Sequence, residues 1–339
     1  MATILVTGGA GYIGSHTVVE LLAAGHKAVI IDNLVNAKPR VISVLEELSQ
    51  QKIPFYREDI RDQVALRRIF NDHHFDAVIH FAALKAVGES VAKPLHYFNV
   101  NVGGLISLGE IMLEAGVFRL IYSSSATVYG TPQKTPLRED DPVSSSAVAN
   151  PYGRTKVICE EILQDICKAD PRWSVAALRY FNPIGAHKSG VIGEDPQGVP
   201  QNIMPNITRV ALGEAPSFAV FGNDYATPDG TCVRDYVHIL DLVAGHLAAL
   251  DYLEDHQGFE AFNLGNGKGY SVLEVLNAFE EATSMQVNRR FEARRPGDVA
   301  SSCADPGKAR DLLAWQTKYG IQEMCADAWR WQQMNPKGY

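Results

Sequence analysis

The sequence predicts an α/β fold: a doubly wound parallel sheet of the Rossmann type, followed by a second, smaller mixed α/β domain. The first half of the chain alternates short, continuously apolar runs with helix-length segments, which is typical of parallel strands covered by helices on both faces. In addition, the glycine-rich stretch "VTGGAGYIGSH" lies between the first apolar run and the first helix, where such sheets bind phosphate groups. The 339 residues suffice for two domains.

Five strands of the sheet are expected in the first half of the chain. Each is an apolar run bounded by polar or turn residues, and none alternates strictly, because a strand buried on both faces needs no polar side. The expected strands are 3–8, 27–32, 76–82, 119–125 and 174–181. Helices are expected between them at 14–25, 62–72, 94–115 and 151–169.

The composition changes after about residue 182. Residues 182–234 are rich in Gly, Pro, Asn and Asp, which indicates loops that shape a pocket. A helix at 237–253 and a strand at 261–265 are expected to return to the first domain. The predicted domains are therefore 1–181 with 236–265 for dinucleotide binding, and 182–235 with 266–339 for substrate binding.

Charge and composition exclude several classes of protein. The net charge is −8 and there is no basic run, which argues against nucleic-acid binding. The start of the chain has no basic leader, and no stretch approaches the roughly 18 apolar residues of a membrane span, so a cytoplasmic protein is expected. The cysteines are odd in number and form no C-x-x-C pair, which indicates reduced thiols and no metal site. They are Cys159, Cys167, Cys232, Cys303 and Cys325.

The glycine-rich stretch predicts a dinucleotide site. Gly8, Gly11 and Gly14 allow a tight turn and a close approach of the backbone to a pyrophosphate at the start of a helix. Asp32 ends the second strand, where a carboxylate accepts hydrogen bonds from a ribose diol and repels a 2′-phosphate, so NAD is expected and NADP is not. The alternative is that Asp32 only caps a turn. The strand ends at 58–60 and 80–83 are further candidates to line the adenosine.

A candidate catalytic pair lies in "PYGRTK". Tyr152 and Lys156 are four residues apart and share one helix face. Alone, this spacing is more often ordinary helix surface. Ser125, however, ends an apolar strand at the edge of the sheet where the ligand binds, and a serine, a tyrosine, a lysine and NAD together can move a proton and a hydride. We expect Lys156 at ~4 Å to lower the pKa of Tyr152 by about 3 units, roughly 4 kcal/mol, so that the phenol acts as a base.

These segments resemble the extended short-chain dehydrogenase/reductase family, and within it the nucleotide-sugar 4-epimerases. The resemblance runs from Thr3 to about Pro336. The segments that carry it are "GGAGYIGSHT", "HFAALKAVGESVAKPL", "SSSATVYG", "PYGRTK", "LRYFNPIGAH", "GEDPQGVPQNIMP", "FGNDYATPDGT", "VRDYVH" and "ARRPGDV".

The resemblance implies an enzyme that interconverts UDP-glucose and UDP-galactose with tightly held NAD. Tyr152 would deprotonate the sugar 4-hydroxyl while hydride passes from C4 to the nicotinamide, and the 4-keto sugar would turn and take the hydride back on its other face. Ser125 would bond the 4-oxygen, and Lys156 would bind the nicotinamide ribose. A homodimer through 94–115 and 151–169 is implied as well.

The family pattern also implies binding residues. Besides the glycines and Asp32, the cofactor set is Tyr12, Ile13, Asn33, Asp59, Ile60, Phe81, Ala82, Lys85 and Phe181, with Tyr152 and Lys156. The nucleotide-sugar set is Asn182, Asn202, Phe221, Arg234, Arg295, Asp298 and Ser302, with Ser125. Two arginines suit a diphosphate, since a guanidinium binds phosphate oxygens in pairs, although each arginine alone would more often be a solvated surface charge.

The chain departs from the family pattern at a few positions. Cys232 stands where a glycine is usual, Gln201 replaces a frequent asparagine, and Val100 replaces an asparagine whose cofactor contact is not carried over. Ser302 occupies the sugar-pocket position where tyrosine is associated with plain hexoses. A small residue there predicts activity on UDP-N-acetylglucosamine and UDP-N-acetylgalactosamine, unless Cys303 closes the pocket instead.

Two other functions would use the same fold or the same cofactor. A nucleotide-sugar 4,6-dehydratase of the same fold needs an acid and a base after the serine, whereas this chain has Ala126 and Thr127. An NAD sensor without chemistry would not need both Tyr152 and Lys156.

Overall fold

The computed structural model describes residues 1–132, 134–198, 200–295 and 297–339, so Val199 and Pro296 of the quoted segments lie outside the described residues. The chain forms two compact units. The first comprises residues 1–130, 141–179 and 243–262, and the second comprises residues 131–140, 180–242 and 263–339. Each unit has its own hydrophobic core.

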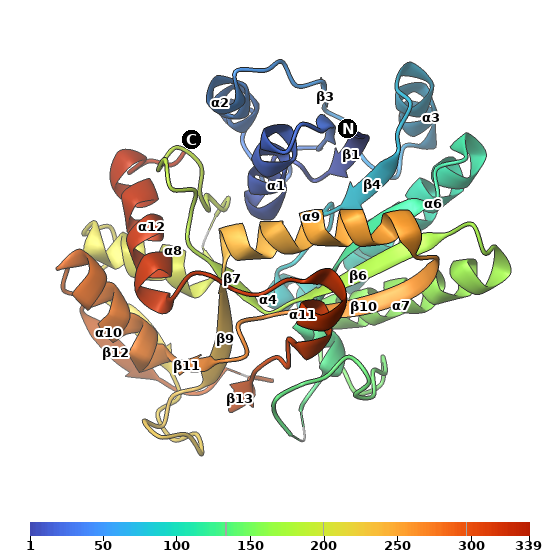
Figure 1. Ribbon diagram of the computed structural model, residues 1–339. Coiled ribbons are helices and arrows are strands. Elements are labelled where there is room, and N and C mark those ends of the chain that lie inside the picture. The colour runs from blue at the N-terminus through green and yellow to red at the C-terminus, as the bar shows by residue number, and fades with distance from the viewer. Residues whose placement is uncertain (133, 199, 296) are drawn as a thin grey trace. The chain divides into compact units, whose positions relative to one another are not determined.

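The centre of the first unit is a seven-stranded sheet (Figure 1). Its strand order is β10-β6-β5-β4-β1-β2-β3, and β1 pairs in parallel with both β2 and β4. The order reverses direction at β1 and β4, and ligands of such sheets bind at the carboxyl ends of the strands beside this point. The strands are β1 (Thr3–Thr7), β2 (Lys27–Ile31), β3 (Phe55–Tyr56), β4 (Ala77–His80), β5 (Arg119–Ser125), β6 (Ser174–Tyr180) and β10 (Gly258–Leu264).

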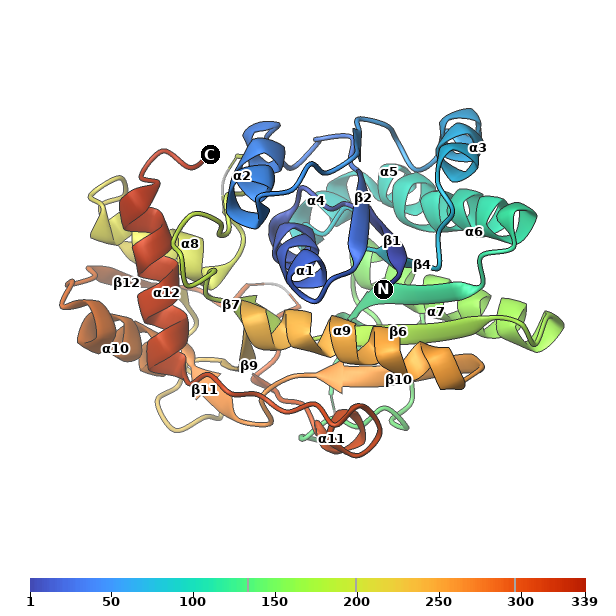
Figure 2. The same ribbon diagram turned by 45° about the horizontal axis from the view of Figure 1, so that its top comes forward.

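Helices cover both faces of this sheet. Figure 2 shows α1 and α9 on the near face and α6 and α7 on the far face. The bounds are α1 (Tyr12–Ala23), α2 (Arg40–Ser49), α3 (Gln63–Asp72), α4 (Val87–Ala92), α5 (Pro94–Tyr97), a π-helix η1 (Phe98–Gly103), α6 (Gly104–Ala115), a 3₁₀-helix η2 (Ala126–Tyr129), α7 (Pro151–Ala169) and α9 (Ile239–Asp255). The core between sheet and helices is aliphatic and aromatic, and Leu5, Leu66, Leu108 and Val175 are fully buried in it.

The start of α7 is fixed by its local sequence. The Asn150 side chain accepts a hydrogen bond from the Gly153 backbone N–H at 2.9 Å, and Pro151 occupies the first helical position. An asparagine cap satisfies one of the open N–H groups of a helix start, and proline loses nothing there because its missing N–H would have no partner. Tyr152 is therefore held in the first turn of a 19-residue helix.

In the part of the chain that the structure describes, the second unit contains two small sheets and the helices α8, α10, α11 and α12. In one sheet, the central strand β9 pairs antiparallel with β11 and parallel with β13 and β7. In the other, β12 and β8 form a parallel pair. The bounds are β7 (Asn182–Ile184), α8 (Ile203–Ala211), β8 (Phe218–Phe221), β9 (Val233–His238), β11 (Gly269–Ser271), α10 (Val272–Thr283), β12 (Arg289–Glu292), β13 (Ser301–Ser302), α11 (Gly307–Leu313) and α12 (Ile321–Met334).

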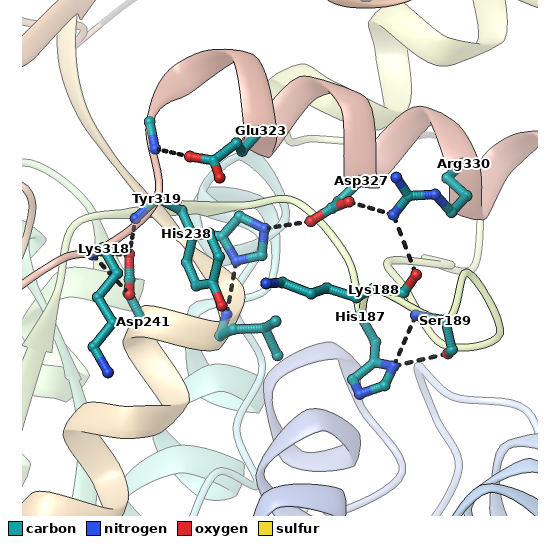
Figure 3. A network of polar contacts seen from close by, with 12 residues as sticks. His187, Lys188, Ser189, His238, Asp241, Lys318, Tyr319, Glu323, Asp327 and Arg330 are labelled. Carbon is teal, nitrogen blue, oxygen red and sulfur yellow. Dashed lines mark hydrogen bonds and ion pairs between the residues drawn. The ribbon is translucent and has the colours of Figure 1, made fainter.

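A buried polar network ties α12 to the end of β9 (Figure 3). His238 Nδ1 accepts the Leu240 backbone N–H at 3.0 Å, so the proton resides on Nε2, which donates to Asp327 Oδ2 at 3.2 Å. The Tyr319 ring lies against His238 with 4.4 Å between centroids, and Arg330 pairs with the other oxygen of Asp327. Burial raises the pKa of Asp327, but the bonds from His238 and Arg330 outweigh burial and lower it.

The predicted fold class is confirmed, and the differences are local. The helix α2 was not predicted, because 33–58 lacks a long apolar run, and the short strand β3 ends at Tyr56, just before the strand end expected at 58–60. The expectation of loops throughout 182–234 was wrong: β7, α8, β8 and the start of β9 lie there, stabilised by packing on α10 and α12 rather than by their own composition. Within the described residues, none of the helices is long and apolar enough to cross a membrane, and all five cysteines are free.

Candidate functional site

The glycine turn closes tightly on itself at the carboxyl end of β1. A Cβ added to Gly14 would lie 2.4 Å from the Gly8 carbonyl oxygen, and one added to Gly8 would lie 2.7 Å from the Ala82 backbone nitrogen. Gly8 also has a φ of +70°, which larger residues rarely adopt. No side chain caps the start of α1 at Gly11, so its backbone N–H groups can bind an anion. The structure thus has the glycine cradle that a pyrophosphate requires.

Asp32 follows β2 and holds this turn. Its Oδ2 accepts the Ala10 backbone N–H at 3.1 Å and its Oδ1 accepts the Leu34 N–H at 2.8 Å. Burial raises the pKa of Asp32 despite these bonds. The carboxylate therefore caps the turn, as the alternative interpretation has it. Each oxygen retains a second lone pair that fits a ribose diol.

The other predicted cofactor residues divide between the two units. In the first unit, Asp59 accepts hydrogen bonds from Arg61 at 2.8 Å and from Asn33 at 3.1 Å, and its pKa is lowered to about 2, first by the Arg61 bond. Phe81 lies directly after β4, and its N–H donates to the Thr7 carbonyl at 2.9 Å. Phe181 belongs to the second unit. The remaining first-unit residues of the set are Tyr12, Ile13, Ile60, Ala82 and Lys85.

The structure brings the three predicted catalytic residues together at the end of β5. The Ser125 hydroxyl is hydrogen-bonded to the Tyr152 phenol and accepts the Thr127 backbone N–H at 3.2 Å. Lys156 is buried, and its Nζ donates to the Ser123 carbonyl at 2.5 Å. A serine, a tyrosine and a lysine therefore meet where the ligand of such a sheet binds.

The prediction that Lys156 lowers the pKa of Tyr152 was wrong when only the side chains of the protein act on the phenol. Burial raises the pKa of Tyr152, and the Ser125 hydrogen bond is what lowers it in part. Burial also lowers the pKa of Lys156 to about 8. Both shifts have one cause: the site has little water, so it disfavours the charged form of each group.

A buried ion pair lies behind these residues and was missed in the sequence. Arg179 donates to Glu160 from Nη2 at 2.7 Å and from Nε at 3.1 Å, and both side chains are at most 4% exposed. Ser124 donates to the same carboxylate at 2.5 Å. The signal was present, because an arginine in the apolar run "SVAALRYF" must be paired when it is buried.

The second unit gathers most of the predicted nucleotide-sugar residues around β9. Arg234 Nη2 pairs with Asp298, and the Arg295 guanidinium lies 4.0 Å from the centroid of the Phe221 ring. Ser302 on β13 pairs with Arg234 in the sheet register. The Arg234–Asp298 ion pair thus has Ser302 beside it in the sheet, and the Arg295 guanidinium lies on the aromatic face of Phe221.

A cavity of about 460 Å³ lies beside this group, within the second unit. Its lining includes Thr131, Lys134, Tyr225, Arg294, Asp298 and Ser301.

Three further residues of the second unit were singled out in the sequence. Asn202 begins α8 and donates to Glu194 Oε1 at 2.5 Å, and Asn182 is exposed at the start of β7. Cys232 is buried in the core, where burial raises its pKa, and it has no left-handed backbone. A cysteine in place of glycine is therefore accommodated without backbone strain.

Comparison with known proteins places these features in one family. The family described as GDP-mannose 4,6 dehydratase matches residues 5–328. A UDP-glucose 4-epimerase from Bacillus subtilis is 52% identical over 336 residues, covering 99% of this chain and 98% of that protein. The crystal structure of UDP-glucose 4-epimerase from Bifidobacterium longum in complex with NAD⁺ and UDP is similar at a TM-score of 0.96 and 46% identity, covering 99% of this chain and 100% of that chain. The UDP-Glc/GlcNAc 4-epimerase from Campylobacter jejuni is similar at a TM-score of 0.85 and 36% identity, covering 98% and 100%.

Proposed function

The chain belongs to the UDP-glucose 4-epimerases of the extended short-chain dehydrogenase/reductase family, and we propose that it interconverts UDP-glucose and UDP-galactose with NAD that stays bound between turnovers. The observation that carries the proposal is the meeting of Ser125, Tyr152 and Lys156 at the carboxyl end of the sheet that also holds the glycine turn. The relative from Bifidobacterium longum, solved with NAD⁺ and UDP, supports both ligands.

The residues of the first unit fit NAD. The turn at Gly8, Gly11 and Gly14 leaves the space that the pyrophosphate needs, and Asp32 receives the adenosine ribose. Lys156 would hold the nicotinamide ribose. When bound, NAD accepts the C4 hydride of the sugar and returns it.

The proton is moved by the protein. Tyr152 takes the proton of the sugar 4-hydroxyl, and Ser125 donates a hydrogen bond to the sugar 4-oxygen as that oxygen becomes negatively charged. Since burial raises the pKa of Tyr152, a nearby positive charge is required to form the phenolate. Lys156 would supply that charge in the low-dielectric site, and bound NAD⁺ would add to it. The 4-keto sugar turns about its link to the diphosphate, and the proton returns from Tyr152 when the hydride is delivered to the other face.

The second unit holds the nucleotide sugar. Arg234 and Arg295 receive the diphosphate, because a guanidinium fork matches phosphate oxygens. Phe221 lies along the uracil, and Asp298 bonds the ribose. Asn182 and Asn202 contact the substrate from β7 and from the start of α8. We propose accordingly that the first unit is the NAD-binding domain and the second the nucleotide-sugar domain.

We also propose that the enzyme interconverts UDP-N-acetylglucosamine and UDP-N-acetylgalactosamine. Ser302 lacks the phenol ring that a tyrosine would place at the wall of the sugar pocket. The alternative, in which Cys303 closes the pocket, is disfavoured because its thiol contacts the Asp235 carboxylate at 3.6 Å. The similar UDP-Glc/GlcNAc 4-epimerase from Campylobacter jejuni supports this substrate range.

The residues after Ser125 bear on dehydration, the rival reaction. Ala126 and Thr127 provide no carboxylate to protonate a leaving hydroxyl, so dehydration is disfavoured.

A homodimer is proposed through α5, α6 and α7. The large exposed apolar residues on α5 and α6 support it: Leu95 is 84% exposed, and Ile106 and Leu113 are exposed as well.

The test is incubation of the purified chain with UDP-galactose and no added cofactor, followed by identification of the product and of any nucleotide released on denaturation. The expected result is UDP-glucose together with released NAD. Formation of a 4-keto-6-deoxy sugar would establish dehydration instead. Bound NAD without turnover would leave only the sensor function.

A further inference from the structure

Three consecutive serines at the end of β5 bind three residues of α7. The Ser123 carbonyl accepts a hydrogen bond from Lys156, the Ser124 hydroxyl donates one to Glu160, and the Ser125 hydroxyl is hydrogen-bonded to the Tyr152 phenol. The α7 residues are spaced by four and therefore lie along one helix face. Two of these α7 residues, Tyr152 and Lys156, belong to the proposed catalytic group. The third, Glu160, does not.

Glu160 is itself held rigidly. Arg179 on β6 donates to both of its oxygens, at 2.7 and 3.1 Å, and a further Arg179 N–H donates to the Tyr129 hydroxyl at 2.9 Å. Tyr129 ends η2, the short helix that begins directly after Ser125. The pair therefore joins β5, η2, α7 and β6, which are the elements that carry or flank the catalytic group. An ion pair this deeply buried is costly to form, so its retention calls for a role.

We propose that Glu160 is a positioning residue for the epimerisation proposed above: its carboxylate, fixed by Arg179 and Ser124, keeps the Lys156 ammonium charged and fixes the strand end that presents Ser125 to Tyr152. The inference rests on the proposed function for its meaning in catalysis, but the charge of Lys156 can be measured without substrate.

The groups around Lys156 leave Glu160 as the anion that acts on it. Burial lowers the pKa of Lys156 to about 8, and Cys159 and Glu160 oppose this. Cys159 is a neutral thiol at that pH, because burial raises its pKa to about 11. His80 is neutral, with a pKa lowered by burial to about 3, and the Tyr122 ring, whose centroid lies 4.8 Å from Nζ, has a pKa raised by burial. Tyr152, the remaining neighbour, has a raised pKa and needs the ammonium rather than supplying a charge to it.

The first experiment compares the pH dependence of kcat for the holoenzyme and for Glu160→Gln. Without the carboxylate, the ammonium of Lys156 is lost at lower pH, so the alkaline fall of kcat moves down by about one pH unit. Glu160→Asp, which keeps the charge, is expected to restore the wild-type position of this fall. Ser124→Ala keeps the charge as well and is expected to lower kcat without moving the profile. A purely structural role would lower kcat equally at every pH, and an unmoved profile in Glu160→Gln overturns the proposal.

Glu160→Gln removes the carboxylate partner of a buried arginine and can fail to fold. The double variant Glu160→Gln with Arg179→Met removes both charges. Because loss of the guanidinium partly offsets loss of the carboxylate, a smaller downward shift of the alkaline fall is expected, and an upward shift overturns the proposal.

A second measurement needs no substrate. Lysine carrying ¹³C at the ε position is titrated by NMR in the holoenzyme, and the Lys156 resonance is identified by its absence in Lys156→Met. The Lys156 pKa is expected to rise and fall with the charge at position 160, so it stays at the wild-type value in Glu160→Asp. Two differences in the Lys156 pKa are compared: that between the wild type and Glu160→Asp, and that between the wild type and a folded charge-free variant. If the first difference is the larger, the role of Glu160 is contradicted. If the wild type does not epimerise UDP-galactose, the proposed function fails while this titration still decides the effect of Glu160 on Lys156.

Discussion

Replacing Tyr152 with phenylalanine removes one hydroxyl from the catalytic group and nothing else. The ring keeps its place in the first turn of α7, and the hydroxyl bonds Ser125. Loss of that hydrogen bond costs about 1 kcal/mol of folding stability, since one exchangeable polar contact is removed. Loss of the base costs far more in rate: general base catalysis is worth roughly 10²–10⁴-fold, or about 3–5 kcal/mol in the activation free energy.

The assay separates these two effects. Epimerisation of UDP-galactose is followed by product identification, NAD content is measured after denaturation, and stability is measured by thermal unfolding. Tyr56→Phe is the matched control, because its hydroxyl also makes one hydrogen bond, to His73 Nε2 at 2.8 Å, away from the catalytic group. Both variants should lose similar stability and keep NAD, and only Tyr152→Phe should lose activity. Near-normal turnover in Tyr152→Phe refutes the role of Tyr152 as the base.

Four further predictions follow from the same geometry. Ser125→Ala should lower kcat less than the loss of Tyr152 does, as measured by the same product assay; the opposite order would make the serine the base. Asp32→Ala combined with an arginine introduced nearby should weaken the binding of NAD and allow NADP to bind, measured as the nucleotide content after purification. An unchanged NAD content would mean that Asp32 only holds the turn. Ser302→Tyr should abolish turnover of the acetylated UDP-sugars and spare UDP-galactose, and a wild type inactive on the acetylated pair would contradict the proposed substrate range. Asp327→Asn should cost about 1–2 kcal/mol of unfolding free energy at pH 7; because the pKa of Asp327 is lowered in the folded chain, its contribution is present above about pH 4 and is lost as the pH falls, so wild type and variant should converge in acid unfolding curves.

The sequence determined the features that depend on neighbouring residues. The turn at Gly8, Gly11 and Gly14 could be predicted because the close contacts of Gly11 and Gly14 with Gly8 lie within one short segment, whereas the contact of Gly8 with Ala82 depends on the neighbouring strand. The helix expected at 151–169 begins as predicted, and its start is fixed locally, by the Asn150 cap and by Pro151 at the first helical position. Parallel strands were predicted from apolar runs, since burial on both faces leaves a local signature.

Only the tertiary structure decided the features that depend on distant residues. The bond between Ser125 and Tyr152 joins residues on two elements, and the pair of Glu160 and Arg179 joins α7 to β6. The pKa of Lys156 is a property of its enclosure, and burial lowers it to about 8 although the spacing in "PYGRTK" had suggested an ordinary ammonium beside a phenol. A sequence pattern states which groups are present and which share a helix face, but the free energy of a charge depends on the water removed around it, and that is set only when the sheet and its helices close over the site.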